Sequence, residues 1–253
     1  MHNIVLEEMT SPSVQAAIED GHTTVIVACG AVEQHGPHIP LFMDSEHGTA
    51  LATEVARRLG NALVAPTIRV GCSKHHMGFP GTLSLKPATF EALCLDYAVS
   101  LAHHGFRHIF FIPSHGGNFA PLERMLPTLN DAVHPQARVV AFVDLHAQIE
   151  LWRRVVQAAA GLGDRVGGHA DIAEGSIMLA LHPHLVHEAE ATSGYVGELT
   201  PELLHRLFSR GTESVSPNGI LGDARGMSKE IGRRCLEATA ELLVRCFNDA
   251  TAS

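Results

Sequence analysis

Cysteine is scarce in this sequence and is not arranged for disulfide or metal chemistry. The five cysteines among 253 residues are widely spaced and form no C-x-x-C pair, so neither a disulfide framework nor a thiolate zinc site is indicated. Hydrophobic runs of membrane-spanning length are also missing, and the opening residues MHNIVLEEMT carry acid where a signal peptide carries base. We therefore expect a cytoplasmic protein without a membrane partner.

Positive charge is scarce as well. Lys and Arg number 18 against 27 Asp and Glu, which leaves a formal net charge of -9 at pH 7. Such a chain has no electrostatic attraction for nucleic acid, and we expect no nucleic-acid partner. The 45% hydrophobic fraction over 253 residues is enough for one well-buried core. We predict a single domain over residues 1–253.

Short apolar runs alternate with helical patterns along the chain. The pattern predicts strands at 23–29, 62–70, 108–113 and 137–145, and helices at 46–60 and 86–105. This alternation is typical of βαβ units, and the continuous apolar character of the strands indicates that helices cover both faces of the sheet. We predict an α/β fold, a three-layer α/β/α sandwich with a mostly parallel central sheet.

Histidine is unusually abundant, and it gathers where the predicted strands end. Its 18 copies equal the total of Lys and Arg, and GAVEQHGPHIPLFMD, GCSKHHMGFPGT and SHGGN follow the first three strands. Because the ligand site of such a sheet lies at the carboxyl ends of the strands, these segments should meet at one edge. Farther along the chain, we expect the glycine-rich residues 161–169 to form a mobile loop. Residues 183–227 have too little periodicity to predict an element.

Several strand-end side chains suit a metal ion. Glu33 and His35 are two apart in an extended segment, so both side chains leave the backbone on the same side. Asp44 follows a proline-rich bend, and its two carboxylate oxygens could bridge a pair of ions. His115 adds a donor after the third strand. The alternative is a solvated polar loop for Glu33, His35 and Asp44, and a glycine turn with a surface histidine for His115. The prolines and glycines of the first loop restrict it more than solvation requires.

A further carboxylate lies on a predicted helix. Glu174 is one turn before the apolar residues Ile177 and Met178, so it belongs to the buried side of that helix. A buried carboxylate is costly unless a cation accompanies it. Mixed nitrogen and oxygen donors of this kind suit Zn, Mn or Fe(II).

Five motifs in this order resemble the creatininase (creatinine amidohydrolase) family. They are ACGAVEQHGPHIPLFMDS, HHMGFPGTLSL, SHGGN, GGHADIAEGSIMLAL and GILGDARGMSKEIG, which together run from about residue 23 to 235. The resemblance implies a dinuclear centre with two divalent metal ions per chain (Zn, Mn or Fe). It places five residues on the ligand positions, with Asp44 as the bridging carboxylate: Glu33, His35, Asp44, His115 and Glu174. It also implies a homo-oligomer, typically a hexamer.

The resemblance further implies amide-bond hydrolysis. A metal-bridging water becomes hydroxide and attacks the carbonyl, and a metal holds the resulting oxyanion. By its position in the motif, His169 is the proton donor to the leaving group, with a suitable ordinary pKa. We predict that five further residues bind substrate, the glycines through close backbone approach and the polar residues by fixing an imidazole or an oxyanion. These are His76, Ser114, Gly116, Gly117 and Asn118.

Departures from the family pattern bear on the substrate. The usual Asn-Gly-His-Gly-Gly-Asn is PSHGGN here, Gly168 replaces a glutamate of creatininase, and Gly117 replaces an acidic residue of the creatinine-specific enzyme. Creatininase also stacks its substrate on tryptophans, whereas Trp152 is the only tryptophan in this chain. We therefore predict a small-molecule substrate with a non-peptide C–N bond in an amide, lactam or formamide, and not creatinine.

Two alternatives remain open at this point. The same centre could hydrolyse a C–C bond of a cyclic ketone derived from a sugar or inositol. The chain could also be a non-catalytic metal-binding protein, which would need neither an open coordination position nor a proton donor.

Overall fold

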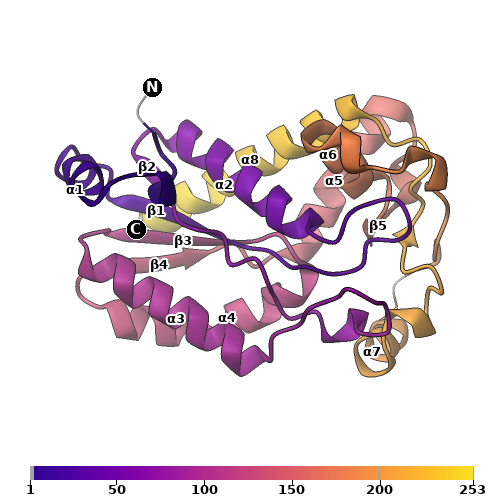
Figure 1. The fold of residues 1–253 in the computed structure, drawn as a ribbon, viewed down its shortest axis with the longest axis horizontal. Coiled ribbons are helices and arrows are strands. Elements are labelled where there is room, and N and C mark those ends of the chain that lie inside the picture. Colours follow the sequence, from indigo (N-terminus) through magenta and orange to yellow (C-terminus); the bar gives the residue numbers. More distant parts are fainter. Residues whose placement is uncertain (1–2, 199, 253) are drawn as a thin grey trace.

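The computed structural model describes residues 3–198 and 200–252, and Figure 1 shows its ribbon. The strands are β1 (Thr24–Cys29), β2 (Ala62–Val64), β3 (His108–Pro113), β4 (Arg138–Ala141), β5 (Val166–His169) and β6 (Leu221–Gly222). The helices are α1 (Ser11–Glu19), α2 (Met43–Leu59), α3 (Pro87–His103), α4 (Gly116–Val133), α5 (Leu145–Ala160), α6 (Ile172–Leu181), α7 (Pro201–Arg210) and α8 (Lys229–Thr251). Short 3-10 helices include η2 (Lys74–His76), η3 (Gly163–Arg165) and η6 (Thr212–Ser214). None of the helices in this part of the chain is both long and apolar enough to cross a membrane.

Four parallel strands form the central sheet in the order β2-β1-β3-β4. In Figure 1, α2 and α8 cover one face of this sheet, and α3 and α4 cover the other. A separate antiparallel pair, β5 and β6, lies at the end of the molecule where α5 and α6 pack. The predicted three-layer α/β/α sandwich with a parallel sheet is therefore confirmed.

Alternation along β1 explains why both faces are covered. Val25 and Val27 pack into the cluster beneath α3 and α4, whereas Ile26 and Ala28 pack into the cluster beneath α2 and α8. Successive side chains of a strand point to opposite faces, so a strand that is apolar at every position needs a helical layer on each side. A third cluster, which includes Trp152, joins α5, α6 and α8.

Two predicted strands are confirmed at nearly full length, and two are shorter than predicted. Strands β1 and β3 match the predicted runs. Strand β2 stops at Val64, just before Ala65 and Pro66, and proline has no N–H to continue a ladder. Strand β4 stops at Ala141 because the chain turns into α5, whose N-cap Asp144 accepts a hydrogen bond from the backbone N–H of Ala147 (2.8 Å).

The helices after the first two strands are also confirmed, with one change that affects the site. Helix α2 begins at Met43, so Asp44 lies in its first turn and not in the loop where the sequence analysis put it. It ends at Gly60, which adopts a left-handed conformation with φ of 79°. Helix α3 covers most of the predicted range 86–105.

The expectation of a mobile loop at 161–169 is wrong. These residues form η3 and β5, and Asp171 accepts hydrogen bonds from the backbone N–H groups of Gly167 and Gly168 (2.8 Å each). A Cβ on Gly167 would lie 2.5 Å from the carbonyl carbon of Leu221. The glycines therefore permit close backbone packing instead of flexibility. Helix α7, within 183–227, was not predicted.

Candidate metal centre

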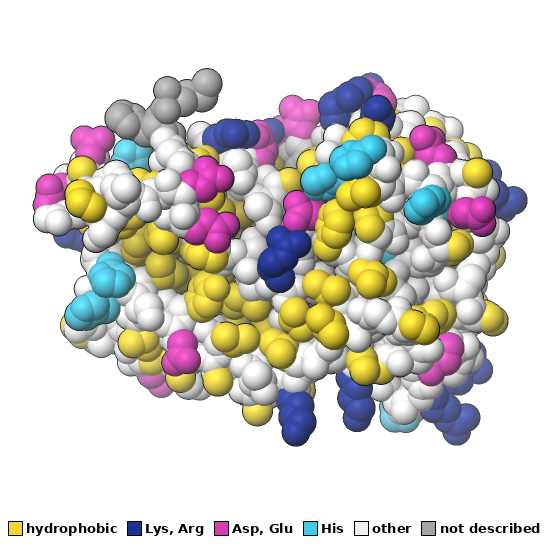
Figure 2. Space-filling view, viewed as in Figure 1, with side chains coloured by type: hydrophobic (Ala, Val, Ile, Leu, Met, Phe, Trp, Pro, Cys, Tyr) yellow, Lys and Arg dark blue, Asp and Glu magenta, His cyan; other side chains and the backbone are white. Residues whose placement is uncertain are grey.

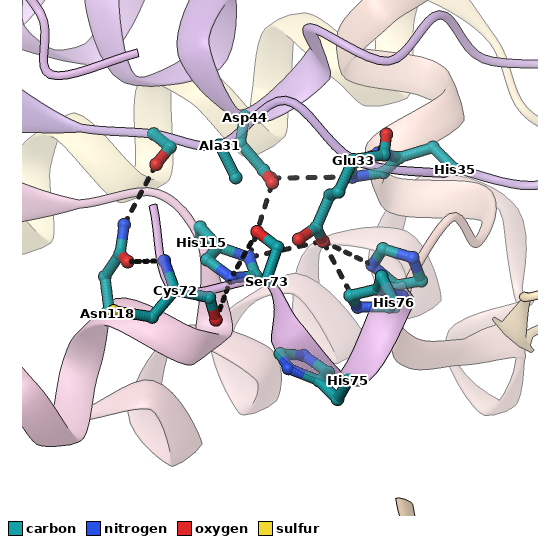
Figure 3. Close-up of polar contacts among 12 residues, drawn as sticks. Ala31, Glu33, His35, Asp44, Cys72, Ser73, His75, His76, His115 and Asn118 are labelled. Atoms are coloured by element: carbon teal, nitrogen blue, oxygen red, sulfur yellow. Dashed lines mark hydrogen bonds and ion pairs between the residues drawn. The ribbon is translucent and has the colours of Figure 1, made fainter. Parts of the chain in front are cut away.

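The candidate site lies at the carboxyl edge of the sheet. Glu33 and His35 follow β1, and His115 is the N-cap residue of α4 directly after β3. Asp44 points toward them from the first turn of α2 (Figure 3). All four side chains belong to residues that are at most 3% exposed. The structure thus brings together the strand ends that the sequence analysis expects to meet.

Strand β5 and helix α6 supply the opposite side of the site. His169 is the last residue of β5, and Glu174 lies in the first turn of α6. The N-cap Asp171 fixes this turn by accepting hydrogen bonds from the backbone N–H groups of Ala173 (2.8 Å) and Glu174 (3.2 Å). The Glu174 side chain itself accepts a hydrogen bond from the backbone N–H of Ala170. Its carboxylate is therefore held in place before any ligand binds.

Asp44 occupies the centre of the donor set. Its Oδ1 lies 3.5 Å from His35 Nε2, and its Oδ2 lies 3.4 Å from His115 Nδ1. Glu174 Oε2 lies 3.6 Å from the same His35 nitrogen, and Glu33 Oε1 lies 3.2 Å from the same His115 nitrogen. Three groups have ligand atoms within 4.8 Å of one another: Glu33, Asp44 and His115; His35, Asp44 and Glu174; Glu33, His35 and His169.

The chemistry of this donor set fits divalent metal ions. Glu33, Asp44 and Glu174 are buried carboxylates, and no Lys or Arg lines the cavity beside them among the residues described. Within the same set, both carboxylate oxygens of Glu33, Oδ2 of Asp44 and Nε2 of His35 make no hydrogen bond. Unpaired polar atoms at this depth are costly, and cations would satisfy them together. Oxygen and imidazole donors are also those that Zn and Mn accept.

The buried carboxylates also raise the pKa values of the histidines beside them. Burial lowers the pKa of His35, but the surrounding carboxylates, Asp44 first, outweigh it and raise that pKa to about 10. Burial likewise opposes protonation of His115, and Glu33 and Asp44 still raise its pKa well above the ordinary value. Burial raises the pKa of Glu174 to about 8. A proton on either histidine nitrogen would occupy the lone pair that a metal ion needs. Metal ions and protons therefore compete for these nitrogens.

Gln34 is a site residue that the sequence analysis missed. Its side-chain nitrogen lies 2.9 Å from His76 Nδ1 and 2.8 Å from His169 Nε2, and it donates to the carbonyl of Gly219 (3.0 Å). The Gln34 backbone carbonyl also lies 3.0 Å from His169 Nε2. One residue therefore orients both imidazoles. The sequence signal that could have identified Gln34 is its position between Glu33 and His35 in EQH.

The predicted substrate-binding residues fall into two groups. His76 and Gly116 line the cavity, whereas Ser114, Gly117 and Asn118 are absent from the lining within the described residues. Ser114 Oγ donates to the carbonyl of Asp44 (2.7 Å), and Asn118 Nδ2 donates to the carbonyls of Cys29 and Gly30 (3.0 Å each). Ser114 and Asn118 therefore brace the scaffold behind the site.

Gly117 is confined by its neighbours. A Cβ there would lie 2.3 Å from the Cys72 carbonyl and 2.6 Å from His115 Nε2. The backbone in this conformation therefore has no room for a larger side chain at this position.

A cavity of about 100 Å³ opens above the donor set. His169 lies in its wall and is 7% exposed. Burial, reinforced by the positive charge of His35, lowers the pKa of His169 well below its ordinary value and keeps the ring neutral. The side chains farther from the donors are apolar and come from α5, α7 and β6. The geometry thus combines a recessed cluster of metal-type donors with a neutral imidazole and an apolar opening.

The donor set and fold agree with a family comparison. The creatininase model, described as creatinine amidohydrolase, matches residues 7–247. This chain belongs to the creatininase family. It is a metal-dependent hydrolase, as the sequence motifs imply.

The creatininase family contains relatives with different substrates. The mycofactocin precursor peptide peptidase of Mycolicibacterium smegmatis is 33% identical over 227 residues, which cover 88% of this chain and 82% of that protein. The 3-dehydro-scyllo-inosose hydrolase of Thermotoga maritima is 27% identical, and the match covers 89% of this chain and 76% of that protein. The creatinine amidohydrolase of Pseudomonas putida is 26% identical, and the match covers 94% of each chain. Family membership therefore leaves the substrate open.

Solved creatininase structures share this fold. A crystal structure of creatininase superposes with a TM-score of 0.83 at 26% identity, covering 99% of this chain and 98% of that one. A mutant creatininase of the Zn-Zn type gives a TM-score of 0.81 at 25% identity and covers 99% of this chain and 99% of its own. A Mn creatininase gives a TM-score of 0.80 at 25% identity and covers 98% of this chain and 99% of its own. Related centres thus occur in both Zn and Mn forms.

Proposed function

We propose that the protein uses two divalent metal ions to hydrolyse an amide C–N bond. The observation that carries this proposal is the position of Asp44, whose two oxygens belong to two different donor groups. A carboxylate so placed can bridge a pair of ions. Glu33 and His115 would hold one ion with it, and His35 and Glu174 would hold the other. Bound ions of this kind lower the pKa of a coordinated water and polarise a carbonyl.

His169 is the residue we propose for proton transfer. Its ring centroid lies 4.5 Å from that of His35, and Gln34 fixes its orientation. Hydrolysis requires a proton to pass from the attacking water to the leaving nitrogen. A neutral imidazole in the cavity wall can accept that proton and then donate it.

The substrate we propose is a small amide, lactam or formamide other than creatinine. A cavity of about 100 Å³ beside the donors suits a small reacting group. Trp152 cannot stack on that group, because it is 2% exposed and its indole N–H donates to Thr239 Oγ1 (2.9 Å) inside the helical core.

A short peptide is a second candidate substrate. It is favoured by relatives that are 30–33% identical and are named for a precursor peptide, although the sequence analysis expects a non-peptide bond. The cyclic-ketone alternative has a relative at 27% identity, but it would set a hydroxyl-rich ring against apolar side chains. A non-catalytic metal-binding protein would need no open cavity beside His169.

A substrate panel tests these proposals. Protein loaded with Zn or Mn is incubated with formamides, lactams, short peptides and cyclic polyol ketones, and products are identified by mass spectrometry. We expect release of an amine and a carboxylate, loss of activity with a chelator and recovery on adding metal. Cleavage confined to the ketones would replace C–N with C–C hydrolysis. Metal-loaded protein that turns over no member of the panel would favour the non-catalytic alternative.

A further inference from the structure

The cavity has two chemically different sides. The donor side carries the three carboxylates and the histidines already described. Apart from the donors, other histidines and glycines, the lining consists of leucine, isoleucine and phenylalanine side chains, and within the described residues it contains no Lys or Arg. These side chains are Leu145 and Ile149 on α5, Leu204, Leu207 and Phe208 on α7, and Leu221 on β6.

Helix α7 carries large apolar side chains that are partly exposed to solvent. Leu204, Leu207 and Phe208 recur at helical spacing and therefore share one face. Leu207 is 3% exposed and anchors the helix, which contacts η2 and η6. Leu204, in contrast, is 37% exposed and Phe208 is 57% exposed, although both line the cavity. Large apolar side chains left open at the mouth of a site are typical of a surface that binds a ligand.

The size of the cavity determines where a substrate must extend. The space above the donors is small, about 100 Å³, so a larger substituent would extend along the apolar side chains of α5 and α7 that line the cavity. There the Phe208 ring stands against His75, with ring centroids 4.8 Å apart. A hydroxyl or charged substituent would lose hydration against these apolar side chains.

We propose that Leu204 and Phe208, with Ile149 in the same cavity lining, bind an apolar substituent next to the scissile amide. The substrate class is then an amide or short peptide with a leucine-sized or aromatic side chain, and these residues determine specificity. The inference rests on the proposed metal-dependent hydrolysis in one respect, because it requires the reacting amide to bind at the donor set. It deepens that proposal by naming what lies beside the amide.

A binding experiment tests the apolar site separately from catalysis. The probes are n-alkyl hydroxamic acids from acetohydroxamate to hexanohydroxamate, whose head group chelates a divalent ion and whose chain would extend toward α7. Calorimetry on Zn-loaded protein gives each dissociation constant. We expect affinity to rise about fourfold per added methylene, and 6-hydroxyhexanohydroxamate to bind more weakly than its unsubstituted counterpart.

Variants of α7 then assign the effect to its residues. In the double variant Leu204→Ala, Phe208→Ala, the gain per methylene should fall below twofold, while acetohydroxamate binds as before. Phe208→Leu should keep most of the gain, and Ser209→Ala on the same helix should keep all of it. Both replaced residues are partly exposed, so metal content and thermal stability should not change.

The outcomes separate this inference from the proposed function. An unchanged gain in the double variant, or no dependence on chain length in the wild type, overturns the inference. Amide hydrolysis that is indifferent to apolar substituents overturns it as well and leaves the proposed function standing. Chain-length dependence without hydrolysis of any amide supports the apolar site and removes the proposed reaction.

Discussion

Glu33, Asp44 and Glu174 are three carboxylates with almost no access to water, and the cavity they line contains no Lys or Arg among the described residues. Desolvation of an unpaired carboxylate costs several kcal/mol, so the fold tolerates all three in their charged form only with compensating positive charge. Imidazolium at His35 and His115 can supply part of it. Metal ions supply it with better geometry, because they also satisfy atoms that imidazolium leaves unbonded.

Replacing the shared carboxylate tests the bridge. Asp44→Asn keeps the shape of the side chain and removes its charge, so we predict lower occupancy at both metal positions together. Inductively coupled plasma mass spectrometry of the purified variant measures this, with Asp96→Asn on α3 as the matched control. Loss of one ion only would show that Asp44 does not bridge.

Replacing the proposed proton carrier should separate turnover from metal content. We predict that His169→Ala lowers kcat by about a hundredfold to ten-thousandfold and leaves nearly all metal in place. The exposed His104→Ala variant is the control. His169 also falls in one donor group with Glu33 and His35, so parallel loss of metal would make it a ligand. Full turnover would move the proton transfer elsewhere, with His76 as the next candidate.

At the scale of elements, the sequence pattern predicts those strands and helices whose positions are determined by hydrophobic burial. Strands β1 and β3 are buried on both faces and so appear as unbroken apolar runs. Strand β5 contains the sequence VGGH, because close approach to Leu221 requires glycine, and glycine in a sequence indicates a loop as readily. Helix α7 was missed because the segments on either side of it in 183–227 lack periodicity, although Leu204, Leu207 and Phe208 recur at helical spacing after the N-cap Thr200.

The packing of α6 against α8 yields an element-scale prediction. A Cβ on Gly232 would lie 1.9 Å from the Ser176 carbonyl oxygen, which belongs to the facing helix. Gly232→Ala should therefore force the helices apart and lower the free energy of unfolding by about 1–3 kcal/mol. Glu237→Ala, at an exposed position of α8, should change it little. Chemical denaturation measures both, and equal stability of the two variants would show that the crossing can adjust.

At the scale of the whole molecule, the site assembles segments from residue 33 to residue 174. The sequence indicates which residues are donors, because chemical type, order and spacing survive in the motifs. It does not indicate that Asp44 would stand on a helix between two groups, or that Gln34 would join His76 and His169. Those relations depend on the tertiary packing of α2, η2 and β5, which no local pattern encodes.

One face of the molecule carries exposed hydrophobic side chains. Figure 2 shows hydrophobic side chains gathered across its middle, where Figure 1 draws the segments between β1 and α2 and between β2 and α3. Met77 and Leu83, in the second of these segments, are each 55% exposed. We propose a homo-oligomer, a hexamer by family resemblance. Light scattering should give about six times the chain mass of 27.1 kDa, and a monomeric mass at working concentration would rule this out.

The central claim is that two metal ions per chain perform the hydrolysis, and elemental analysis coupled to activity tests it most directly. Chelated protein is titrated with Zn or Mn while bound metal and turnover of an identified amide substrate are followed on the same sample. We predict two tightly bound ions per chain, with activity reaching its plateau only as the second ion binds. Full activity in protein that holds no more than one ion per chain would contradict the account.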